Sequence, residues 1–386
     1  MTRLTRGRTI HIEPFDSTEW GRCWEFVRVE VDGERVSWMR TFEVEHRLRD
    51  VEITSLGVVG VHTADEYQNR GHMRFMLESA LERSRERGIL LSTLYGVPSL
   101  YQRWAYASVM PEFVTTISTR QAELVRRNHR VRSADRSDWP AMARLFNRET
   151  ASLSGSRVRD ADRWTGPRQG AMWSGTKTWS VVATDARGRV VGYCTCDDGD
   201  GLGVRSRDLN LTYEVTVGDA QAVSSRVASS LVSAIAREAV RRRVAKISFH
   251  VPPQSRIGSY LRNYDVSVTS TRPVDRAQMV RLTDPGGVLK KLEPYVQQQV
   301  SGLSSRRPSR LVIRTELGDG EMVLGGRGSS RQLRLPATRL AELMFGYRTA
   351  HELRMIHGVR IARDDAEILD VLFPPMDAYC YWPDRY

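Results

Sequence analysis

The sequence is poor in cysteine and contains no long apolar run. Its 386 residues include four cysteines, scattered between Cys23 and Cys380, which favours a reducing, cytoplasmic setting over a disulfide scaffold. No apolar run approaches the ~20 residues that cross a bilayer, and the basic N-terminus lacks the apolar core of a secretory signal. We therefore expect a cytoplasmic protein with no membrane partner.

Metal-ligand patterns and nucleic-acid motifs are also scarce. Cys194 and Cys196 stand close together without a nearby His or further Cys, so we expect two strand positions and no metal site. Lysine and arginine total 58 against 46 aspartates and glutamates, a formal net charge of +12, which favours anionic partners. The basic residues are dispersed and no recurring nucleic-acid motif is present, so nucleic acid is the least favoured partner.

The chain is long enough for two or three domains. Alternating apolar residues at 22–61 predict strands with a hairpin at "DGE" (32–34), followed by a helix over 71–87 and the strand "ILLSTLYG". A second β-α-β pattern recurs downstream, and the pattern changes again toward the C-terminus. We expect a mixed α/β (α+β) fold with domains at 1–130, 131–285 and 286–386.

The stretch "YQNRGHM" (67–73) lies where the first β-α-β strand meets its helix. A helix N-terminus presents unpaired backbone N–H groups and the positive end of its dipole, and a glycine lets an anion approach the backbone closely. The stretch lacks the G-K-[ST] ending of a P-loop and the three glycines of a dinucleotide fingerprint. Taken alone, it is better explained as an ordinary strand–helix turn.

In its strand–helix–strand setting, however, the pattern Q-x-x-G-x-x resembles motif A of the GNAT acetyltransferases. In that family, loop amides hold the pyrophosphate of acetyl-CoA, and the preceding strand binds the pantetheine arm. The resemblance implies strand contacts from Val59 and Val61. It also implies a phosphate loop that consists of Gln68, Asn69, Arg70, Gly71, His72, Met73 and Arg74.

A second stretch, "SLYQRWAYASVMPE" (99–112), resembles the family's Y-x-x-x-G-[FY] segment, above all in the Eis (enhanced intracellular survival) type. The resemblance makes Tyr101 the proton donor to the departing CoA thiolate, a role that suits a phenol. The alternative is a half-buried aromatic residue whose hydroxyl is satisfied nearby. Ala105 stands where the family has a glycine, before the second tyrosine, Tyr106.

Eis-type proteins have an N-terminal GNAT domain, a degenerate second GNAT domain and a C-terminal domain like sterol carrier protein, an order that fits the predicted elements. Their terminal carboxylate acts as base or proton relay for the acceptor amine. The resemblance gives this role to Tyr386, at the end of the aromatic tail "CYWPDRY". The alternative is a tail that packs on its own domain or on another subunit. A homo-oligomer, such as a hexamer, is also implied.

These features predict an acetyl-CoA-dependent N-acyltransferase that requires no metal. Its acceptor is an amine of a small molecule or of a carrier-bound metabolite, and the basic balance favours an anionic acceptor or an acidic carrier. Too few residues precede the loop for the family's usual first strand and two acceptor-binding helices. The alternative is therefore a GNAT-fold protein without acetyltransferase activity, which serves a hetero-partner as a subunit or catalyses other biosynthetic chemistry.

Overall fold

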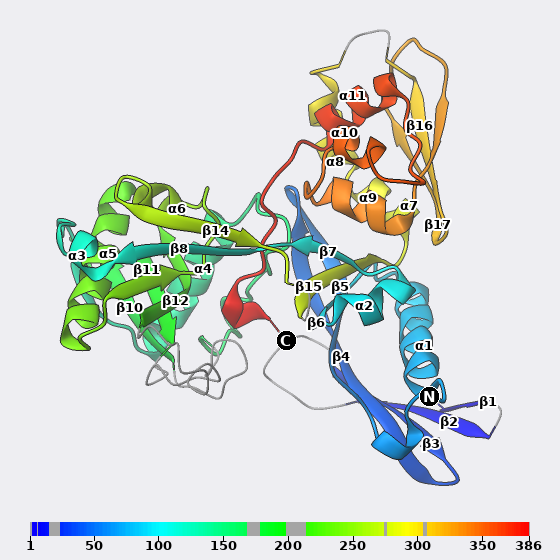
Figure 1. The fold of residues 1–386 in the computed structure, drawn as a ribbon, viewed down its shortest axis with the longest axis horizontal. Helices are drawn as coiled ribbons and strands as arrows, with labels where there is room; N and C mark the ends of the chain where they lie inside the picture. Colours follow the sequence, from blue (N-terminus) through cyan, green and yellow to red (C-terminus); the bar gives the residue numbers. More distant parts are fainter. Residues whose placement is uncertain are drawn as a thin grey trace.

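The computed structural model describes residues 2–5, 7–14, 24–167, 178–197, 214–273, 276–303 and 307–385. These residues form three lobes around a central junction, each built on its own β-sheet (Figure 1). The mixed α/β class predicted from the sequence is confirmed. Within the described ranges, no helix is long and apolar enough to span a membrane.

The first lobe contains an eight-stranded sheet in the order β1-β2-β3-β4-β5-β6-β15-β7. Neighbouring strands are antiparallel except β5 and β6, which run parallel because helix α1 connects them. Asp32 and Gly33 both have positive φ in the β3–β4 turn, which confirms the predicted hairpin. The elements are β1 (Thr2–Thr5), β2 (Arg8–Pro14), β3 (Trp24–Val31), β4 (Glu34–Leu48), β5 (Val51–Thr63), η1 (Asp65–Tyr67), α1 (His72–Glu86), β6 (Leu91–Gly96), α2 (Pro98–Tyr101), η2 (Gln102–Trp104), β7 (Ala107–Met110) and β15 (Ala277–Leu282).

The second lobe repeats this arrangement in a seven-stranded sheet, β14-β8-β13-β12-β11-β10-β9. Here β12 and β13 are the parallel pair, and α5 connects them. The predicted second β-α-β unit is therefore confirmed. The elements are β8 (Glu112–Ser118), α3 (Thr119–Glu123), β9 (Arg130–Ser133), η3 (Arg136–Asp138), α4 (Trp139–Glu149), β10 (Thr178–Thr184), β11 (Val190–Asp197), β12 (Glu214–Ala222), α5 (Ser225–Arg241), β13 (Lys246–Phe249), α6 (Arg256–Leu261) and β14 (Val266–Thr271).

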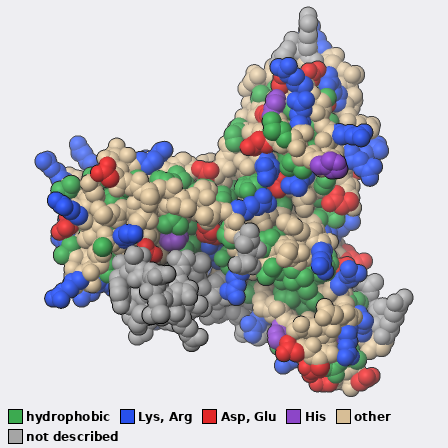
Figure 2. Space-filling view, viewed as in Figure 1, with side chains coloured by type: hydrophobic (Ala, Val, Ile, Leu, Met, Phe, Trp, Pro, Cys, Tyr) green, Lys and Arg blue, Asp and Glu red, His purple; other side chains and the backbone are tan. Residues whose placement is uncertain are grey.

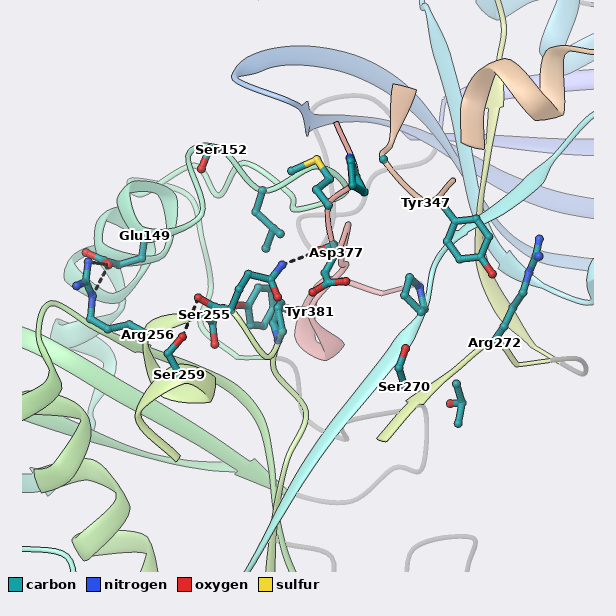
Figure 3. Close-up of a pocket in the computed structure, with 18 of the residues that line it drawn as sticks. Glu149, Ser152, Ser255, Arg256, Ser259, Ser270, Arg272, Tyr347, Asp377 and Tyr381 are labelled. Atoms are coloured by element: carbon teal, nitrogen blue, oxygen red, sulfur yellow. Dashed lines mark hydrogen bonds and ion pairs between the residues drawn. The ribbon is translucent and has the colours of Figure 1, made fainter. Parts of the chain in front are cut away.

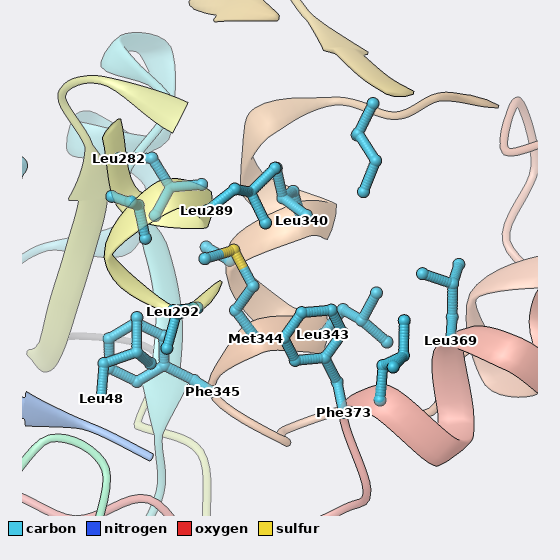
Figure 4. Close-up of a cluster of buried hydrophobic side chains, with 14 of the residues drawn as sticks. Leu48, Leu282, Leu289, Leu292, Leu340, Leu343, Met344, Phe345, Leu369 and Phe373 are labelled. Carbon is cyan, nitrogen blue, oxygen red and sulfur yellow. The ribbon is translucent and has the colours of Figure 1, made fainter. Parts of the chain in front are cut away.

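The C-terminal lobe combines a three-stranded sheet, β17-β16-β18, with five helices of the described chain. Its apolar core is continuous with the underside of the first sheet, since Leu48 and Leu282 join Leu289, Leu343 and Phe373 in one cluster (Figure 4). The elements are α7 (Pro285–Lys291), α8 (Glu293–Val300), β16 (Arg310–Thr315), β17 (Gly318–Val323), β18 (Arg331–Arg334), α9 (Ala337–Met344), α10 (Ala350–Arg354) and α11 (Arg363–Leu372).

The lobes exchange strands with one another. Strand β7 completes the edge of the first sheet, whereas β8, which follows directly after Pro111, lies inside the second sheet. The chain returns to the first sheet with β15, which inserts between β6 and β7. The predicted boundaries near 130 and 285, and the likeness of the third lobe to sterol carrier protein, remain predictions.

The last described residues form a strap, residues 374–385, that leaves the C-terminal lobe and runs between the other two lobes (red in Figure 1). Its side chains alternate between two cores: Ala378 and Cys380 pack with the C-terminal lobe, and Tyr379 and Tyr381 pack in the second lobe. The strap ends in a short turn, η6 (Trp382–Asp384). The aromatic tail is therefore largely buried, although Tyr386 lies outside the described residues.

The side chain of His46 is buried at the junction of the first two lobes, where it pairs through its backbone with Arg157. Neither ring nitrogen has a hydrogen-bond partner among the described residues. Burial, and secondarily the nearby Arg157 charge, lower the pKa of His46 to about 3. The imidazole is therefore neutral at pH 7 and resists protonation.

Acid should consequently destabilise the fold through His46. The folded pKa lies below the unfolded value, so the stability that the neutral ring retains above pH 6.5 is lost as the pH falls toward 3. Between pH 7.5 and pH 5, the unfolding free energy of the wild type should fall by about 2 kcal/mol more than that of His46→Leu. Urea unfolding at the two pH values measures this, and parallel losses in both proteins would contradict it.

Lysine and arginine side chains are scattered over all three lobes on the face seen in Figure 2. They do not gather into one patch on this face, which agrees with the dispersed pattern in the sequence.

Candidate active site

A cleft opens in the first sheet because its two parallel strands part. β5 and β6 pair from Ser55 and Leu91 as far as Val58 and Leu94, while β5 itself continues to Thr63. Beyond the last pair lies a cavity of about 220 Å³, lined by Val58, Val59, Gly60, Val61, Leu94, Tyr95, Tyr101 and Arg276. Two predicted strand residues, Val59 and Val61, and the predicted catalytic tyrosine thus line the same cavity.

The backbone of β5 is irregular where it borders this cavity. Its pairing with β4 shifts register, because Trp38 lies opposite His62 and Arg40 lies opposite Val59. Gly60, in between, has φ +63, a conformation that favours glycine. Such a bulge leaves an extra residue unpaired in the ladder, and this irregular stretch of β5, with Gly60, lines the cavity.

Tyr101 closes the cavity from the other side. Its ring lies against Gly96, where an added Cβ would come within 2.5 Å of the ring, and it meets Tyr106 edge-on at 5.9 Å. Its hydroxyl makes no hydrogen bond to any residue that the structure describes, whereas that of Tyr106 bonds Ser92 Oγ at 2.7 Å. Burial raises the pKa of Tyr101 to about 12, so the phenol keeps its proton at ordinary pH.

The backbone conformation of the neighbouring Ala105 explains why the resembled segment has a glycine at this position. Ala105 has φ +57 and ends the short helix η2. This left-handed conformation is unfavourable for a residue with a Cβ, so the chain retains the turn geometry with a less suitable residue.

The predicted phosphate loop lies at the opening of α1. Gly71 is the N-cap residue, with φ +78 and no side chain to cap the helix, and Asn69 also has a positive φ of 59. The first backbone bond across this end runs from Phe75 N to Gly71 O at 3.1 Å. The N–H groups of His72, Met73 and Arg74 therefore have no partner within the helix.

Three arginines lie at this opening, and the first turn of α1 contains no acidic residue, although Asp65 and Glu66 stand in the preceding short helix η1. Arg70 and Arg74 are exposed, and a third arginine, Arg8 of β2, donates from Nη2 to the Arg70 carbonyl at 2.7 Å. Arg8 Nη1 would lie 3.7 Å from a Cβ at Gly71. Unpaired amides, a helix dipole and three guanidinium groups fit a diphosphate.

The side chains of other predicted loop residues contact residues of the loop and of the short helix before it. Gln68 Nε2 donates to Asp65 Oδ1 at 2.7 Å, and the Arg70 guanidinium lies over the Tyr67 ring at 5.3 Å. His72 is buried beside Tyr67, and burial, with Arg8 and Arg70 nearby, lowers its pKa. Met73 is half-buried. These side chains shape the turn, so the backbone provides most of the anion-binding groups.

The strap brings its end to the cleft. Arg385 is buried and pairs with Glu112 at 2.8 Å and 2.9 Å. Its guanidinium also lies over the ring of Tyr95, 5.7 Å from the centroid, and Tyr95 lines the cleft cavity. The chain therefore reaches the wall of the cleft one residue before its end, and Tyr386, the other predicted catalytic residue, lies outside the described residues.

A buried ionic network fixes the strap just before this point. Arg159 donates from Nη2 to Asp384 at 2.8 Å and lies 2.9 Å from Asp219, and its Nη1 donates to the Tyr193 hydroxyl at 2.9 Å. The three charged side chains are at most 2 % exposed. The guanidinium also lies 3.6 Å from the centroid of the Phe146 ring.

The corresponding cleft of the second lobe is filled. β12 and β13 pair only to Val217 and Phe249. Where they would part, Trp382 of the strap lies over Gly218 and 3.7 Å, ring to ring, from His250. Helix α5 is capped by the Ser224 side chain, which accepts from Val227 N. This lobe therefore lacks both the open cleft and the uncapped helix start of the first.

Several residues of the site could not be found from the sequence. Arg8, Tyr95 and Arg276 are separated from the motif by long stretches of chain and carry no local signal.

Cys194 and Cys196 are fully buried in β11. Within the described ranges, no group of three or more His, Cys, Asp or Glu is arranged to hold a metal ion.

Comparison with known proteins supports the GNAT resemblance for the first lobe. Residues 15–109 match a family model described as an acetyltransferase (GNAT) domain. No curated protein matches the chain by sequence.

Solved structures with the same fold cover most of the chain. A GCN5-related N-acetyltransferase from Anabaena variabilis has a TM-score of 0.70 at 15% identity, and the match covers 94% of this chain and 89% of that one. A GCN5-related N-acetyltransferase from Kribbella flavida has 0.67 at 18% (94% and 87%). Eis1 from Mycobacterium abscessus has 0.66 at 16% (94% and 90%). Residues 15–109 thus resemble a GNAT acetyltransferase domain, and the chain shares its fold with these solved structures.

Proposed function

We propose that the chain is an acetyl-CoA-dependent N-acyltransferase whose active site is the cleft between β5 and β6. The observation that carries this proposal is the parting of the two strands beyond Val58 and Leu94 beside the uncapped start of α1. A cleft of this kind accepts an extended thioester arm, and a helix start binds its diphosphate. Acetyl-CoA supplies the activated acyl group.

The residues at the cleft suit each step of the transfer. The acceptor amine attacks the thioester carbonyl and forms the C–N bond, while the C–S bond breaks. Backbone N–H groups at the β5 bulge stabilise the negative charge on the carbonyl oxygen. Tyr101 donates its phenolic proton to the departing sulfur, and its raised pKa keeps that proton in place until then.

The proton that leaves the amine passes, in this proposal, to the terminal carboxylate of Tyr386, directly or through water. The position of Arg385 against Tyr95 supports this assignment. Deleting Tyr386 should lower kcat at least tenfold while acetyl-CoA still raises the melting temperature. An unchanged kcat would remove the terminus from the mechanism.

Arg8 should strengthen cofactor binding. Its guanidinium is held beside Gly71 by the Arg70 carbonyl, where it adds a charge to the diphosphate site. Arg8→Ala should raise the KM for acetyl-CoA about tenfold with little change in kcat. Steady-state kinetics at low and high salt measure this, because the wild type should lose more affinity with salt than the variant. Arg237→Ala, at an exposed position of helix α5, is the control, and equal KM values in Arg8→Ala and this control would contradict the role.

The first test of the proposed function is thermal-shift titration with CoA and acetyl-CoA. A ligand that binds only the folded chain increases the free energy of unfolding by about 2.7 kcal/mol at 100 times its Kd, and the melting temperature therefore rises. Release of free CoA thiol with a panel of neutral, anionic and cationic amines then defines the acceptor. No shift at millimolar cofactor would favour the alternative, a GNAT-fold protein without acetyltransferase activity. The amine panel tests the proposed preference for anionic acceptors. The oligomeric state can be measured on the same samples.

A further inference from the structure

A larger cavity lies away from the cleft, where the second lobe, the C-terminal lobe and the strap meet (Figure 3). We call it the interdomain cavity. Its volume is about 1210 Å³, somewhat above the ~300–1,000 Å³ typical of small-molecule sites, which are frequent between domains. Glu149, Arg256, Arg272, Tyr347 and Asp377 contribute to its wall.

This cavity is not a second site for the acyl donor. It borders the ends of β12 and β13, through Gln221 and Pro252, and is thus the outer remnant of the second-lobe cleft. The inner part is filled by Trp382, and Ser224 caps the adjacent helix. At the start of α6, which lines the cavity, the Ser255 side chain already accepts from Gly258 N, and both arginines that line it are paired.

The cations on the wall are already neutralised. Arg256 Nη2 lies 3.2 Å from Glu149 Oε2. Arg272 pairs with Glu342 at 3.6 Å, and its guanidinium lies over the Tyr347 ring at 4.8 Å. Neither guanidinium is free to bind an anion without breaking an existing pair.

Asp377 differs from these residues. Its carboxylate forms no hydrogen bond or ion pair with any residue that the structure describes, although its backbone oxygen accepts from Gln254 Nε2 at 3.3 Å. Figure 3 shows the carboxylate pointing into the cavity. Burial raises its pKa, with no contribution from a neighbouring cation. A partly desolvated carboxylate without a counter-charge is unfavourable, and a bound cation would relieve that cost.

The rest of the wall suits a hydroxylated ligand. The side chains of Ser152, Ser270 and Thr271 line the cavity, are exposed to it, and make no hydrogen bond within the described chain. We propose that the interdomain cavity binds a small organic cation that carries a hydroxyl group, with its charge paired to Asp377.

The overall charge of the protein makes this site easy to test. A chain of formal net charge +12 repels cations in general, so specific binding of one identifies a local site. Choline and 3,3-dimethyl-1-butanol have the same shape and hydroxyl group and differ in charge alone. Choline cannot accept an acyl group on its nitrogen, so turnover does not confuse the result. Isothermal titration calorimetry should detect choline binding and find the uncharged analogue at least tenfold weaker.

Asp377→Asn keeps the side-chain shape and the backbone contact to Gln254, and it should weaken choline binding at least tenfold. Asp364→Asn is the matched control: its carboxylate is 75% exposed on α11, and affinity should not change. Ser270→Arg places a cation in the cavity and should also abolish binding. Tyr101→Phe should bind choline like the wild type, which separates this site from the cleft. Equal affinity of choline and its analogue, full affinity in Asp377→Asn, or no binding by the folded wild type would overturn the proposal.

Discussion

Tyr101→Phe should lower kcat by about 100- to 1,000-fold while the KM for acetyl-CoA stays within a few-fold of the wild type. The substitution removes one oxygen that makes no hydrogen bond with the described residues, so the folded state loses nothing except the proton donor. The ring remains packed on Gly96 and against Tyr106. Thiol release with an acceptor that the wild type acetylates is the measurement.

Tyr106→Phe is the matched control for this experiment. The Tyr106 hydroxyl is buried and bonds Ser92 Oγ, so its loss should lower stability by about 1 kcal/mol and leave kcat nearly unchanged. Because burial raises the pKa of Tyr101 to about 12, its ionisation should not appear in a pH–rate profile below pH 10. If Tyr101→Phe kept a third of the wild-type kcat, another group would have to protonate the sulfur.

Arg159→Met should destabilise the chain by about 3–5 kcal/mol, because it leaves Asp219 and Asp384 buried without their cation. Methionine fills part of the volume against Phe146, so the effect reports mainly the unpaired charges. Denaturant unfolding measures the loss. Arg163→Met is the control, because Arg163 is 76% exposed and its ion pair with Asp160 is long, at 4.0 Å. This variant should unfold like the wild type.

A second substitution separates charge from packing in this network. Asp384→Asn on the Arg159→Met background removes one of the two carboxylates that have lost their cation, and it should restore part of the lost stability. Asp384 belongs to the strap, so Arg159→Met should also expose the strap to proteolysis. A loss below about 1 kcal/mol in Arg159→Met would mean that water already compensates these carboxylates.

Much of the fold could be predicted because local patterns and tertiary packing agree. The "DGE" hairpin, the helix that begins within "YQNRGHM" and the strand that ends at Gly96 all form as expected, with boundaries within a few residues. Leu77, Ala80 and Leu81 recur at helical spacing, which is typical of one apolar helix face, and these side chains pack on the sheet. Met73 is only half-buried, because His72 and Met76 occupy the face nearest the strands.

The sequence predicted only those parts of the candidate site whose residues lie close together along the chain. Gln68 to Arg74 form one turn, so their spacing carries the signal of a helix opening. Arg8 reaches that turn through the register of β2, β3 and β4, and Arg276 reaches the cleft because β15 returns from beyond the second lobe. No pattern in the sequence predicts either contact, since each depends on strand pairing between distant segments.

Local patterns along the chain were enough to predict the alternation of strands and helices, the glycine at the start of α1 and the tyrosine that follows β6. Backbone propensity and hydrophobic periodicity act over a few residues, so a single stretch of chain is enough to specify such features. Three other features are visible only in the folded chain: one cleft is open, the other is filled by Trp382, and Asp377 lacks a counter-charge among the described residues. These features arise where three lobes and a strap meet, because packing and electrostatics depend on distance in space and not on distance along the chain.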